Sequence, residues 1–366
     1  MAWTKYQLFL AGLLVVTGSI NTLATKYADT SRAVGRPDKE YWNGSMLLPT
    51  DEEHEFNHPF LQATGMFIGE FSCLILFKLI WFVYALRKTP AQKLPDILQG
   101  NQNFSPWIFY LPALCDMVAT SVMYVGLFMT YPASFQMFRG AVIVFTGLFS
   151  MIFLKRRLFV YKWVGILLVL GGLAILGVAD METTPSGEYT TSGVITGDLL
   201  IIVAQVVSAG QMVLEEKFVS QRNVPPLQAV GWEGLFGMCT LGLILIPMYF
   251  IPKHGVPFED SIDGIYQIGQ SRDVAGGFFG TMISISFSNF AGVSITKQLS
   301  ATTRMVLDSV RTIVIWAVSL AMGTQKFQPI TIAGFAVMLI GMATYNNIFF
   351  VPFMVKRGWI RDPEKQ

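Results

Sequence analysis

Charged residues are scarce in this chain, and their scarcity excludes several classes of protein. Asp, Glu, Lys and Arg make up 14% of the 366 residues, whereas soluble domains contain about 25%. Hydrophobic residues reach 52%, far more than a disordered or collagen-like chain contains. The formal net charge is only +2 and the longest basic run is Lys155-Arg156-Arg157, so no nucleic-acid partner is indicated. The composition predicts a polytopic membrane protein.

Cysteine and histidine are also few. The cysteines, Cys73, Cys115 and Cys239, all fall within apolar runs, and an odd number of buried thiols forms no disulfide framework. No His/Cys cluster has the spacing of a metal site, and no Gly-x-x-x-x-Gly-Lys-Ser/Thr loop is present. We therefore expect no metal, no cofactor and no ATP-driven pump. We also expect no enzyme, because no histidine falls within an apolar run where it could act as an intramembrane base.

Long apolar runs predict the architecture. A membrane-spanning helix needs about 20 mostly apolar residues. The chain contains ten such runs, which predict an all-α integral membrane protein with ten transmembrane helices. The predicted spans are 7–25, 60–86, 107–129, 133–154, 159–179, 197–214, 228–251, 274–296, 300–323 and 329–351.

The distribution of Lys and Arg predicts the orientation. With a cytosolic N-terminus, the inside loops contain about twice as many Lys and Arg as the outside loops, which is the bias of membrane proteins. Both termini are then cytosolic. We expect a glycan at Asn43, whose sequon lies in the first outside loop, and none at Asn103, whose sequon lies inside. The histidines, at positions 54, 58 and 254, fall in outside loops, where we expect solvated side chains; a lumenal pH sensor is the alternative.

An internal repeat divides the chain. The segment Pro59–Gly65 (PFLQATG) reappears as Pro225–Gly231 (PPLQAVG), and each copy begins a predicted span. In addition, residues 107–177 align with 276–346 without a gap. We therefore predict two five-helix repeats, 1–180 and 181–366, the second ending in a cytosolic tail. Because five is odd, the second repeat enters the membrane inverted, an arrangement common among secondary transporters.

Several stretches carry a resemblance to a known family. They are 134–150 (SFQMFRGAVIVFTGLFS), 301–311 (ATTRMVLDSVR), 196–202 (TGDLLII) and 212–218 (MVLEEKF). With the ten helices, the chain resembles the drug/metabolite transporter superfamily, in the nucleotide-sugar-transporter-like solute carrier family 35, and within it one member of subfamily F. The resemblance covers almost the whole chain. It implies a multi-pass transporter of lysosomal or other endomembranes. Family members that carry guanosine sugars have a Phe-Tyr-Asn-Asn motif in the seventh helix. In this chain a Tyr-Asn-Asn run occurs in the tenth span and not in the seventh, so no nucleotide-sugar site is carried over.

Charged side chains within predicted spans are the candidate functional residues, because a charge at the centre of a bilayer costs about 2.5–3.5 kcal/mol on insertion scales. Arg304, Asp308 and Arg311 are spaced by four and three residues and share one face of a helix. Arg139 aligns with Asp308 in the repeat. We assign to a substrate cavity Gln136, Arg139, Arg304, Asp308, Arg311 and Asn289.

Two interpretations of the arginines remain open. They form structural ion pairs that hold helices together, or one of them is released to bind an anionic substrate through paired hydrogen bonds. Three carboxyls, Glu70, Asp116 and Glu233, are candidates for proton coupling. Desolvation favours the neutral form of a carboxyl, so such a group can exchange a proton between an acidic lumen and a neutral cytosol.

The sequence therefore predicts a secondary transporter of a small organic anion or zwitterion that works by alternating access, with proton coupling as an option. The lysosomal membrane is favoured, with Golgi and mitochondrial membranes as alternatives. A nucleotide-sugar antiporter and a non-transporting membrane scaffold are the competing functions. The expected partners are a small-molecule substrate and the lipid bilayer, and a homodimer is compatible with the sequence.

Overall fold

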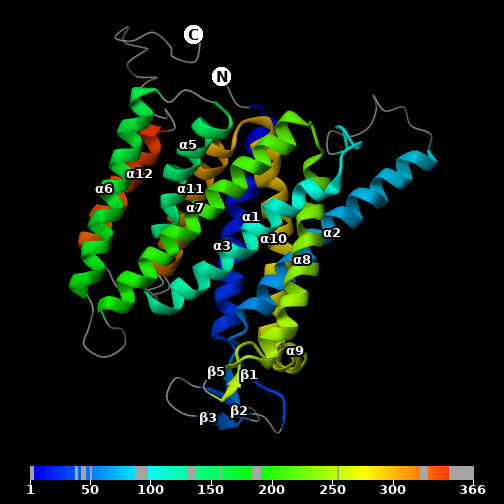
Figure 1. The fold of residues 1–366 in the computed structure, drawn as a ribbon, viewed down its shortest axis with the longest axis vertical. Helices are drawn as coiled ribbons and strands as arrows, with labels where there is room; N and C mark the ends of the chain where they lie inside the picture. The colour runs from blue at the N-terminus through cyan, green and yellow to red at the C-terminus, as the bar shows by residue number, and fades with distance from the viewer. Residues whose placement is uncertain are drawn as a thin grey trace. The chain divides into compact units, whose positions relative to one another are not determined.

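The computed structural model describes residues 4–37, 40–42, 47–49, 52–87, 98–130, 135, 137–155, 159–183, 191–253, 255–321 and 329–345, and these are mostly helical (Figure 1). Seven helical segments are long and apolar enough to cross a membrane. They lie in α1 (Lys5–Thr30), α2 (Pro59–Leu86), η2 with α3 (Pro106–Phe109, Tyr110–Met129), α6 (Val160–Thr183), α7 (Thr191–Gln221), α8 (Pro226–Phe250) and α10 (Arg272–Gln298).

The other three predicted spans also coincide with helices. These are η3 with α5 (Arg139–Ala141, Val142–Phe153), α11 (Ala301–Ala321) and α12 (Pro329–Tyr345). In the described residues α5 and α12 are shorter than a full span, and α11 falls outside the group of long apolar helices. The all-α membrane character is therefore confirmed, and the number of ten crossings stays a prediction.

The chain folds as two compact units, and each unit takes segments from both halves of the sequence. Unit 1 comprises residues 1–117 and 222–294, and unit 2 comprises residues 118–221 and 295–366. The predicted repeats, 1–180 and 181–366, were defined by sequence similarity rather than by contacts. The division into repeats therefore stays a prediction.

In unit 1, α2 and α8 pack closely because α8 presents glycines to α2. Gly231 lies against Leu74, Gly234 against Glu70, and Gly237 against Phe67. Residue numbers rise along one helix as they fall along the other, so the two helices are antiparallel. Because these three positions of α8 have no side chain, the two backbones can approach closely, as is common between membrane helices.

In unit 1, α1 packs against α10 through small and polar residues. Asn21 Oδ1 accepts a hydrogen bond from Ser284 Oγ at 3.3 Å, and the hydroxyls of Thr25 and Thr281 lie 3.2 Å apart. These side chains satisfy one another where water is absent, so the contact tolerates hydrocarbon surroundings.

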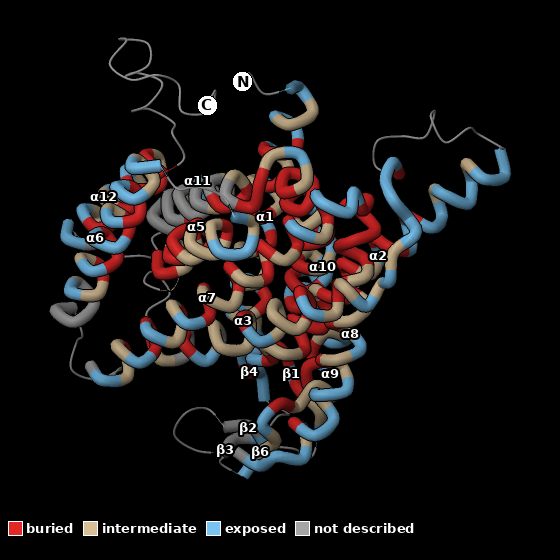
Figure 2. Tube along the Cα trace, turned by 45° about the horizontal axis from the view of Figure 1, so that its top comes forward, coloured by how far each residue is buried: buried red, intermediate tan, exposed pale blue. Residues whose placement is uncertain are grey.

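In unit 2, α6 and α12 are antiparallel neighbours (Figure 1). Gly165 lies against the backbone of Tyr345, Gly172 against Met338, and Gly334 against Leu176. Around this contact is the main buried apolar cluster of the unit, which includes Val169 and Phe335. Buried positions gather along the facing sides of the two helices in Figure 2.

The segment between α1 and α2 forms short antiparallel ribbons instead of the plain loop that we expected. Strand β1 (Arg32–Val34) pairs with β4 (Glu53–Glu55), and β2 (Glu40–Trp42) pairs with β3 (Leu47–Pro49). A third ribbon, β5 (Pro252–Lys253) with β6 (Val256–Pro257), precedes a ten-residue helix, α9 (Ser261–Gln270), which the sequence analysis missed.

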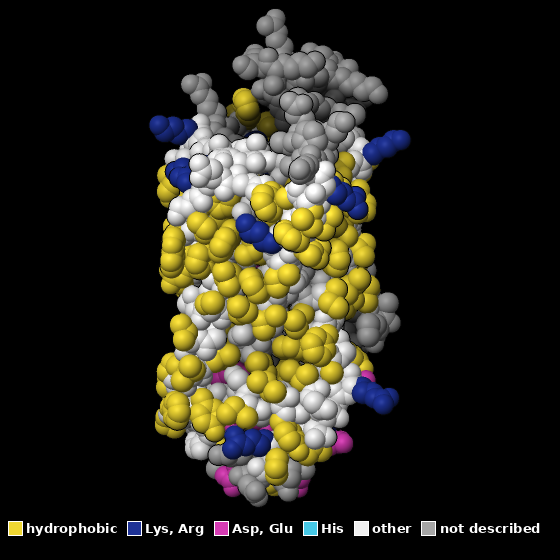
Figure 3. Space-filling model, turned by 90° about the vertical axis from the view of Figure 1, so that its right-hand side faces the viewer, with side chains coloured by type: hydrophobic (Ala, Val, Ile, Leu, Met, Phe, Trp, Pro, Cys, Tyr) yellow, Lys and Arg dark blue, Asp and Glu magenta, His cyan; other side chains and the backbone are white. Residues whose placement is uncertain are grey.

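Outward-facing side chains are largely apolar. Leu79, Leu243 and Ile283, for example, are each more than half exposed. On the face shown in Figure 3, hydrophobic side chains form a broad band, and Lys and Arg side chains lie mainly toward its two ends. Such a surface suits contact with lipid rather than water.

Two adjacent glycines of α6 provide a test of the helix packing. A methyl group on Gly172 would lie 2.7 Å from the backbone N of Met338, whereas a methyl group on Gly171 would have no atom within 4 Å. We expect Gly172→Ala to lower the free energy of unfolding by about 1–3 kcal/mol, because a backbone cannot move aside for the methyl. Gly171→Ala should leave it unchanged or slightly raised. Thermal unfolding in detergent compares the two, and equal midpoints would contradict this packing.

Candidate functional site

The clearest ionic contact within the membrane helices is in unit 2. Arg304, near the start of α11, places Nη1 2.5 Å from Oε2 of Glu215 on α7, and both side chains are buried. Gln211, one turn earlier on α7, donates a hydrogen bond to the other oxygen of Glu215 at 2.9 Å. Each carboxylate oxygen therefore has a donor, which a buried charge requires.

The neighbouring carboxyl, Glu216, holds the start of the same helix. Its Oε2 accepts a hydrogen bond from the backbone N–H of Ala301, the first residue of α11, at 3.0 Å. The first N–H groups of a helix have no partner within the helix, and a carboxylate there also complements the helix dipole. Sequence reasoning missed Glu215 and Glu216 because they directly follow the predicted span 197–214, where charged residues are ordinary loop residues.

Other predicted cavity residues of unit 2 have contacts of their own. Asp308 and Arg311 pair with each other on α11, with 3.5 Å between Oδ1 and Nη1, and both are only partly buried. Arg311 Nε has no hydrogen-bond acceptor among the described residues. Arg139 lies in η3, with its guanidinium carbon 5.9 Å from the ring centre of Phe135. Gln136 lies outside the described residues.

Unit 1 brings together another part of the predicted set. Glu70 on α2 is 3% exposed, and its Oε1 accepts a hydrogen bond of 2.5 Å from Asn289 Nδ2 on α10. Glu233 is buried on α8, next to the Gly234 that packs against Glu70. Asn289 was assigned to the substrate cavity, but the structure places it beside a proton-coupling candidate. The third such candidate, Asp116, is half-buried on α3.

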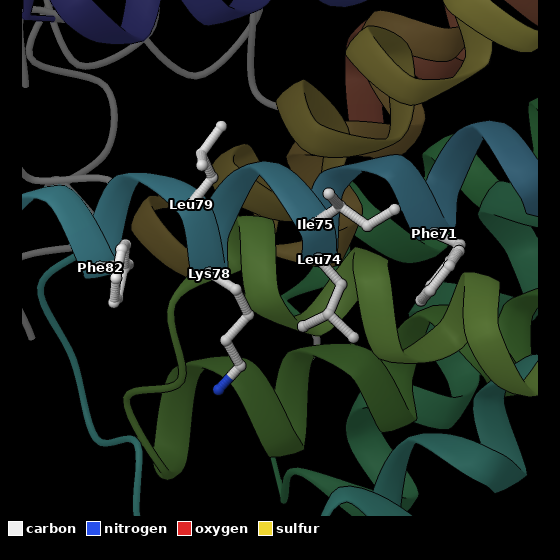
Figure 4. A pocket seen from close by; sticks show the side chains of 6 residues that line it. All are labelled: Phe71, Leu74, Ile75, Lys78, Leu79 and Phe82. Atoms are coloured by element: carbon white, nitrogen blue, oxygen red, sulfur yellow. The ribbon is translucent and has the colours of Figure 1, made fainter.

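An apolar groove follows α2. It is lined by side chains from successive turns of this one helix, Phe71, Leu74, Ile75, Lys78, Leu79 and Phe82 (Figure 4). Lys78 is the only charged residue among them, and it is exposed. A groove on one helix with a single ammonium group fits a lipid-facing surface on which the lysine extends toward the membrane boundary. The groove is therefore not our candidate for the substrate site.

The prediction that His54 and His58 are solvated is wrong. They are 6% and 8% exposed and pack against α9 in unit 1. Oδ2 of Asp263 lies 3.1 Å from Nε2 of His54 and 3.5 Å from Nε2 of His58. His58 Nδ1 also lies 3.1 Å from Oε1 of Glu259. His254 and the predicted glycosylation site Asn43 lie outside the described residues.

The carboxylates of Asp263 and Glu259, which form a buried cluster with His54 and His58, keep His58 protonated. Burial alone lowers the pKa of His58, but hydrogen bonds and charges from Asp263 and Glu259 outweigh it and raise the pKa to about 9. Burial likewise favours a raised pKa of Asp263, but hydrogen bonds from His54, His58 and the backbone N–H of Arg36 hold it well below its usual range. Both charges therefore persist between pH 5 and 7, which does not fit a sensor of lumenal acidity. Within the described residues, no group of three or more His, Cys, Asp or Glu could hold a metal ion.

Contacts between loops of unit 1 agree with the predicted order of its crossings. The segments around His54 and Asp263 were both predicted to lie outside, and they are in contact. The loops at Asn101 and Asn223 were both predicted to lie inside, and a backbone hydrogen bond of 2.8 Å joins them. The pairing fits the order of crossings, while the membrane face that each pair occupies stays a prediction.

Comparison with known proteins identifies the family. The family model for solute carrier family 35, in its F group, matches residues 52–347. This chain belongs to solute carrier family 35. Its membership confirms the resemblance seen in the sequence and implies a multi-pass membrane transporter rather than an enzyme.

Individual relatives support the assignment. This solute carrier is 54% identical to human solute carrier family 35 member F6 over 354 residues, which cover 95% of this chain and 91% of the human one. It is 31% identical to an uncharacterized protein of Schizosaccharomyces pombe over 93% and 97% of the two chains. A solved crystal structure with 14% sequence identity aligns with a TM-score of 0.56 over 94% of this chain and 98% of the other, which shows a shared fold.

The raised pKa of His58 gives a pH dependence with a defined sign. Because the folded-state pKa, about 9, exceeds the unfolded value of about 6.5, the stabilisation is complete below pH 6.5 and is lost as the pH rises through 9. We expect the midpoint of thermal unfolding to fall between pH 6.5 and 9.5 more steeply for the wild type than for His58→Gln. Arg32→Gln, on the exposed β1 strand, is the control and should follow the wild type. Parallel curves for the wild type and His58→Gln would show that the cluster does not stabilise the fold.

The pair between Arg304 and Glu215 predicts strong coupling between two substitutions. Arg304→Met should cost about 3–5 kcal/mol of stability, because it leaves a buried carboxylate without its cation. Glu215→Gln combined with Arg304→Met should recover most of the loss. A double-mutant cycle of unfolding free energies measures the coupling. Additive effects of the two substitutions would be the contradicting outcome.

Proposed function

We propose that this solute carrier is a secondary transporter that moves a small organic anion or zwitterion across an endomembrane by alternating access. Family membership supports transport as such. The partly accessible Arg311 supports the substrate class, and it is the observation on which the proposal depends. A guanidinium in a membrane helix is costly to maintain, and a retained charge of this kind generally serves a function.

The two readings of the arginines correspond to different residues. Arg304 pairs with the buried carboxylate of Glu215 and so joins α11 to α7, which stabilises the structure of unit 2. Within the described part of the chain, Arg311 pairs with Asp308 at 3.5 Å, one turn away on the same helix, and its Nε has no acceptor. A carboxylate or phosphate group can replace Asp308 and accept two parallel hydrogen bonds from the guanidinium. Arg139 is the second candidate for the same anion.

We place proton coupling at Glu70. Its carboxyl is buried on α2 and accepts a hydrogen bond from Asn289 on α10, so gain or loss of a proton there would change a contact between two helices of unit 1. A proton taken from an acidic lumen and released to the cytosol would drive substrate out of the compartment. This direction suits the lysosomal membrane, with both termini in the cytosol.

An inverted repeat would supply the movement of the two halves that alternating access requires. The contact between α6 and α12 supports such a repeat. The sequence repeat makes Gly165 equivalent to Gly334, and Gly172 equivalent to Gly341. Gly165 lies against the backbone of Tyr345, and its counterpart Gly334 lies against Leu176, the position that corresponds to Tyr345. The two helices therefore exchange equivalent contacts, as elements related by a two-fold axis in the membrane plane do.

Comparison of organelles with and without the protein tests the substrate class. Lysosomes from cells that lack it should accumulate an organic anion or zwitterion, and the wild-type gene should reverse the accumulation. Arg311→Gln should fail to reverse it, with transport reduced about 10–100-fold, because a charge-assisted hydrogen bond contributes about 1.5–3 kcal/mol. Lys78→Gln, which removes a cation from the lipid-facing groove, should act as the wild type. Accumulation of lipophilic cations alone would contradict the proposal.

Proteoliposomes loaded with the accumulated metabolite then test the coupling. Transport by the wild type should increase with a pH gradient. Glu70→Gln keeps an acceptor for Asn289 and should abolish this dependence while the protein remains folded. Glu53→Gln, at an exposed position of β4, is the matched control. If Glu70→Gln retains the full dependence, the carboxyl is not the coupling group.

A further inference from the structure

The short helix α9 has the reverse of the polarity expected for a helix on a water-soluble surface. Its exposed side carries Ile262, Ile265 and Tyr266, which are 50%, 60% and 37% exposed. Its buried side carries Asp263 and Gln267, which are 3% and 0% exposed. The tube in Figure 2 shows exposed and buried positions alternating along this helix. A helix that faces water normally shows the opposite arrangement.

The polar side of α9 is fixed by the segment that precedes α2. Asp263 binds His54, His58 and the backbone N–H of Arg36. Gln267 donates to the carbonyl oxygen of Ala33 at 3.3 Å. These bonds determine which side of the helix points inward, so the apolar stripe is held outward by the fold and is not free to turn.

Exposed apolar side chains also occur on the membrane helices of the same unit that precede and follow α9 in the chain. On α8, Leu243, Ile246 and Phe250 are 67%, 58% and 75% exposed. On α10, Phe279 and Ile283 are 51% and 62% exposed. Both helices are long and apolar enough to span a membrane.

Chain connectivity keeps α9 at the end of these helices. It ends at Gln270, and α10 begins at Arg272. Two residues extend at most about 7 Å, so the end of α9 cannot leave the boundary of the bilayer in which α10 begins. At the other end of the helix, the Asp260 side chain accepts hydrogen bonds from the backbone N–H groups of Ile262 and Asp263, and a carboxylate at this position suits the hydrated side of the boundary.

We propose that α9 is an interfacial helix, whose Ile262, Ile265 and Tyr266 side chains lie among the acyl chains at the membrane surface where α8 ends and α10 begins. The helix then contacts lipid on one side and the β1–β4 ribbon on the other. It attaches that ribbon to the membrane through the bonds of Asp263 and Gln267. A tyrosine at the edge of the apolar stripe suits this boundary, because its hydroxyl reaches the headgroups while its ring stays in hydrocarbon.

Spin-label accessibility tests the proposal in the full chain. A background without native thiols (Cys73→Ala, Cys115→Ala, Cys239→Ala) receives one nitroxide label at Ile262→Cys or Ile265→Cys, in phosphatidylcholine vesicles. Ile283→Cys on α10 is the membrane reference, and Glu55→Cys, at an exposed position of β4, is the aqueous reference. Oxygen dissolves in lipid, whereas a nickel chelate stays in water, so power saturation with each reagent reports the surroundings of the label.

The expected result is that labels at 262 and 265 collide with oxygen more than with the nickel chelate, close to the behaviour of the label at 283. Two outcomes would overturn the proposal. Behaviour like the label at 55 would place the stripe in water, and exclusion of both reagents would mean that protein, such as a second copy of the chain, covers it.

A second measurement needs no substitution. Wild-type protein in vesicles that contain a phosphatidylcholine with a photoreactive acyl chain is illuminated, digested and analysed by mass spectrometry. The peptide with residues 258–270 should carry lipid adducts, and the peptide with residues 47–57 should carry none. Adducts on α8 and α10 but none on 258–270 would contradict the interfacial position even if the labelled variants fail to fold.

Discussion

The high cost of a charge or an unpaired polar group in hydrocarbon is the constraint on which this structure depends. Three of the buried carboxyls receive a hydrogen bond from another helix. Arg304 reaches Glu215 from α11, the start of α11 reaches Glu216, and Asn289 reaches Glu70 from α10. Each contact removes a penalty of desolvation and at the same time joins two helices. Structural support within each unit therefore depends on a few polar side chains.

Such contacts require helices that approach closely, and glycine provides the space. Gly234 lets α8 reach Glu70 on α2, and Gly172 lets α6 reach Met338 on α12. Apolar packing in a membrane gains little from exclusion of water, because lipid tails are equally apolar, so close van der Waals contact and hydrogen bonds supply the stabilisation. A glycine at the crossing point therefore matters more here than it would in the core of a soluble protein.

The sequence predicts the helices well and their polar partners poorly, for one physical reason. A helix of a membrane protein is a continuous run of apolar residues, so its position is visible locally. A contact such as Arg304 with Glu215 joins residues 89 positions apart, and nothing in either segment specifies the other. His54 and His58 were misread for the same reason, because Asp263 is distant in the chain. The α9 stripe does have a local signal, Asp260 as a helix cap followed by Ile262, Ile265 and Tyr266 at helical spacing, within a segment taken for a loop.

The candidate groups are divided between the two units, and this division constrains any mechanism. Glu70, Glu233 and Asn289 belong to unit 1, whereas the arginines belong to unit 2. In the proposed mechanism, a proton bound in unit 1 influences an anion held in unit 2 through helices that continue from one unit into the other. Two helices qualify, because the boundaries between the units fall within α3, after Met117, and within α10, after Ser294. Asn289 binds Glu70 five residues before the boundary in α10. A change in the protonation of Glu70 would therefore act on a helix that continues into unit 2, which gives the proposed coupling a direct covalent route.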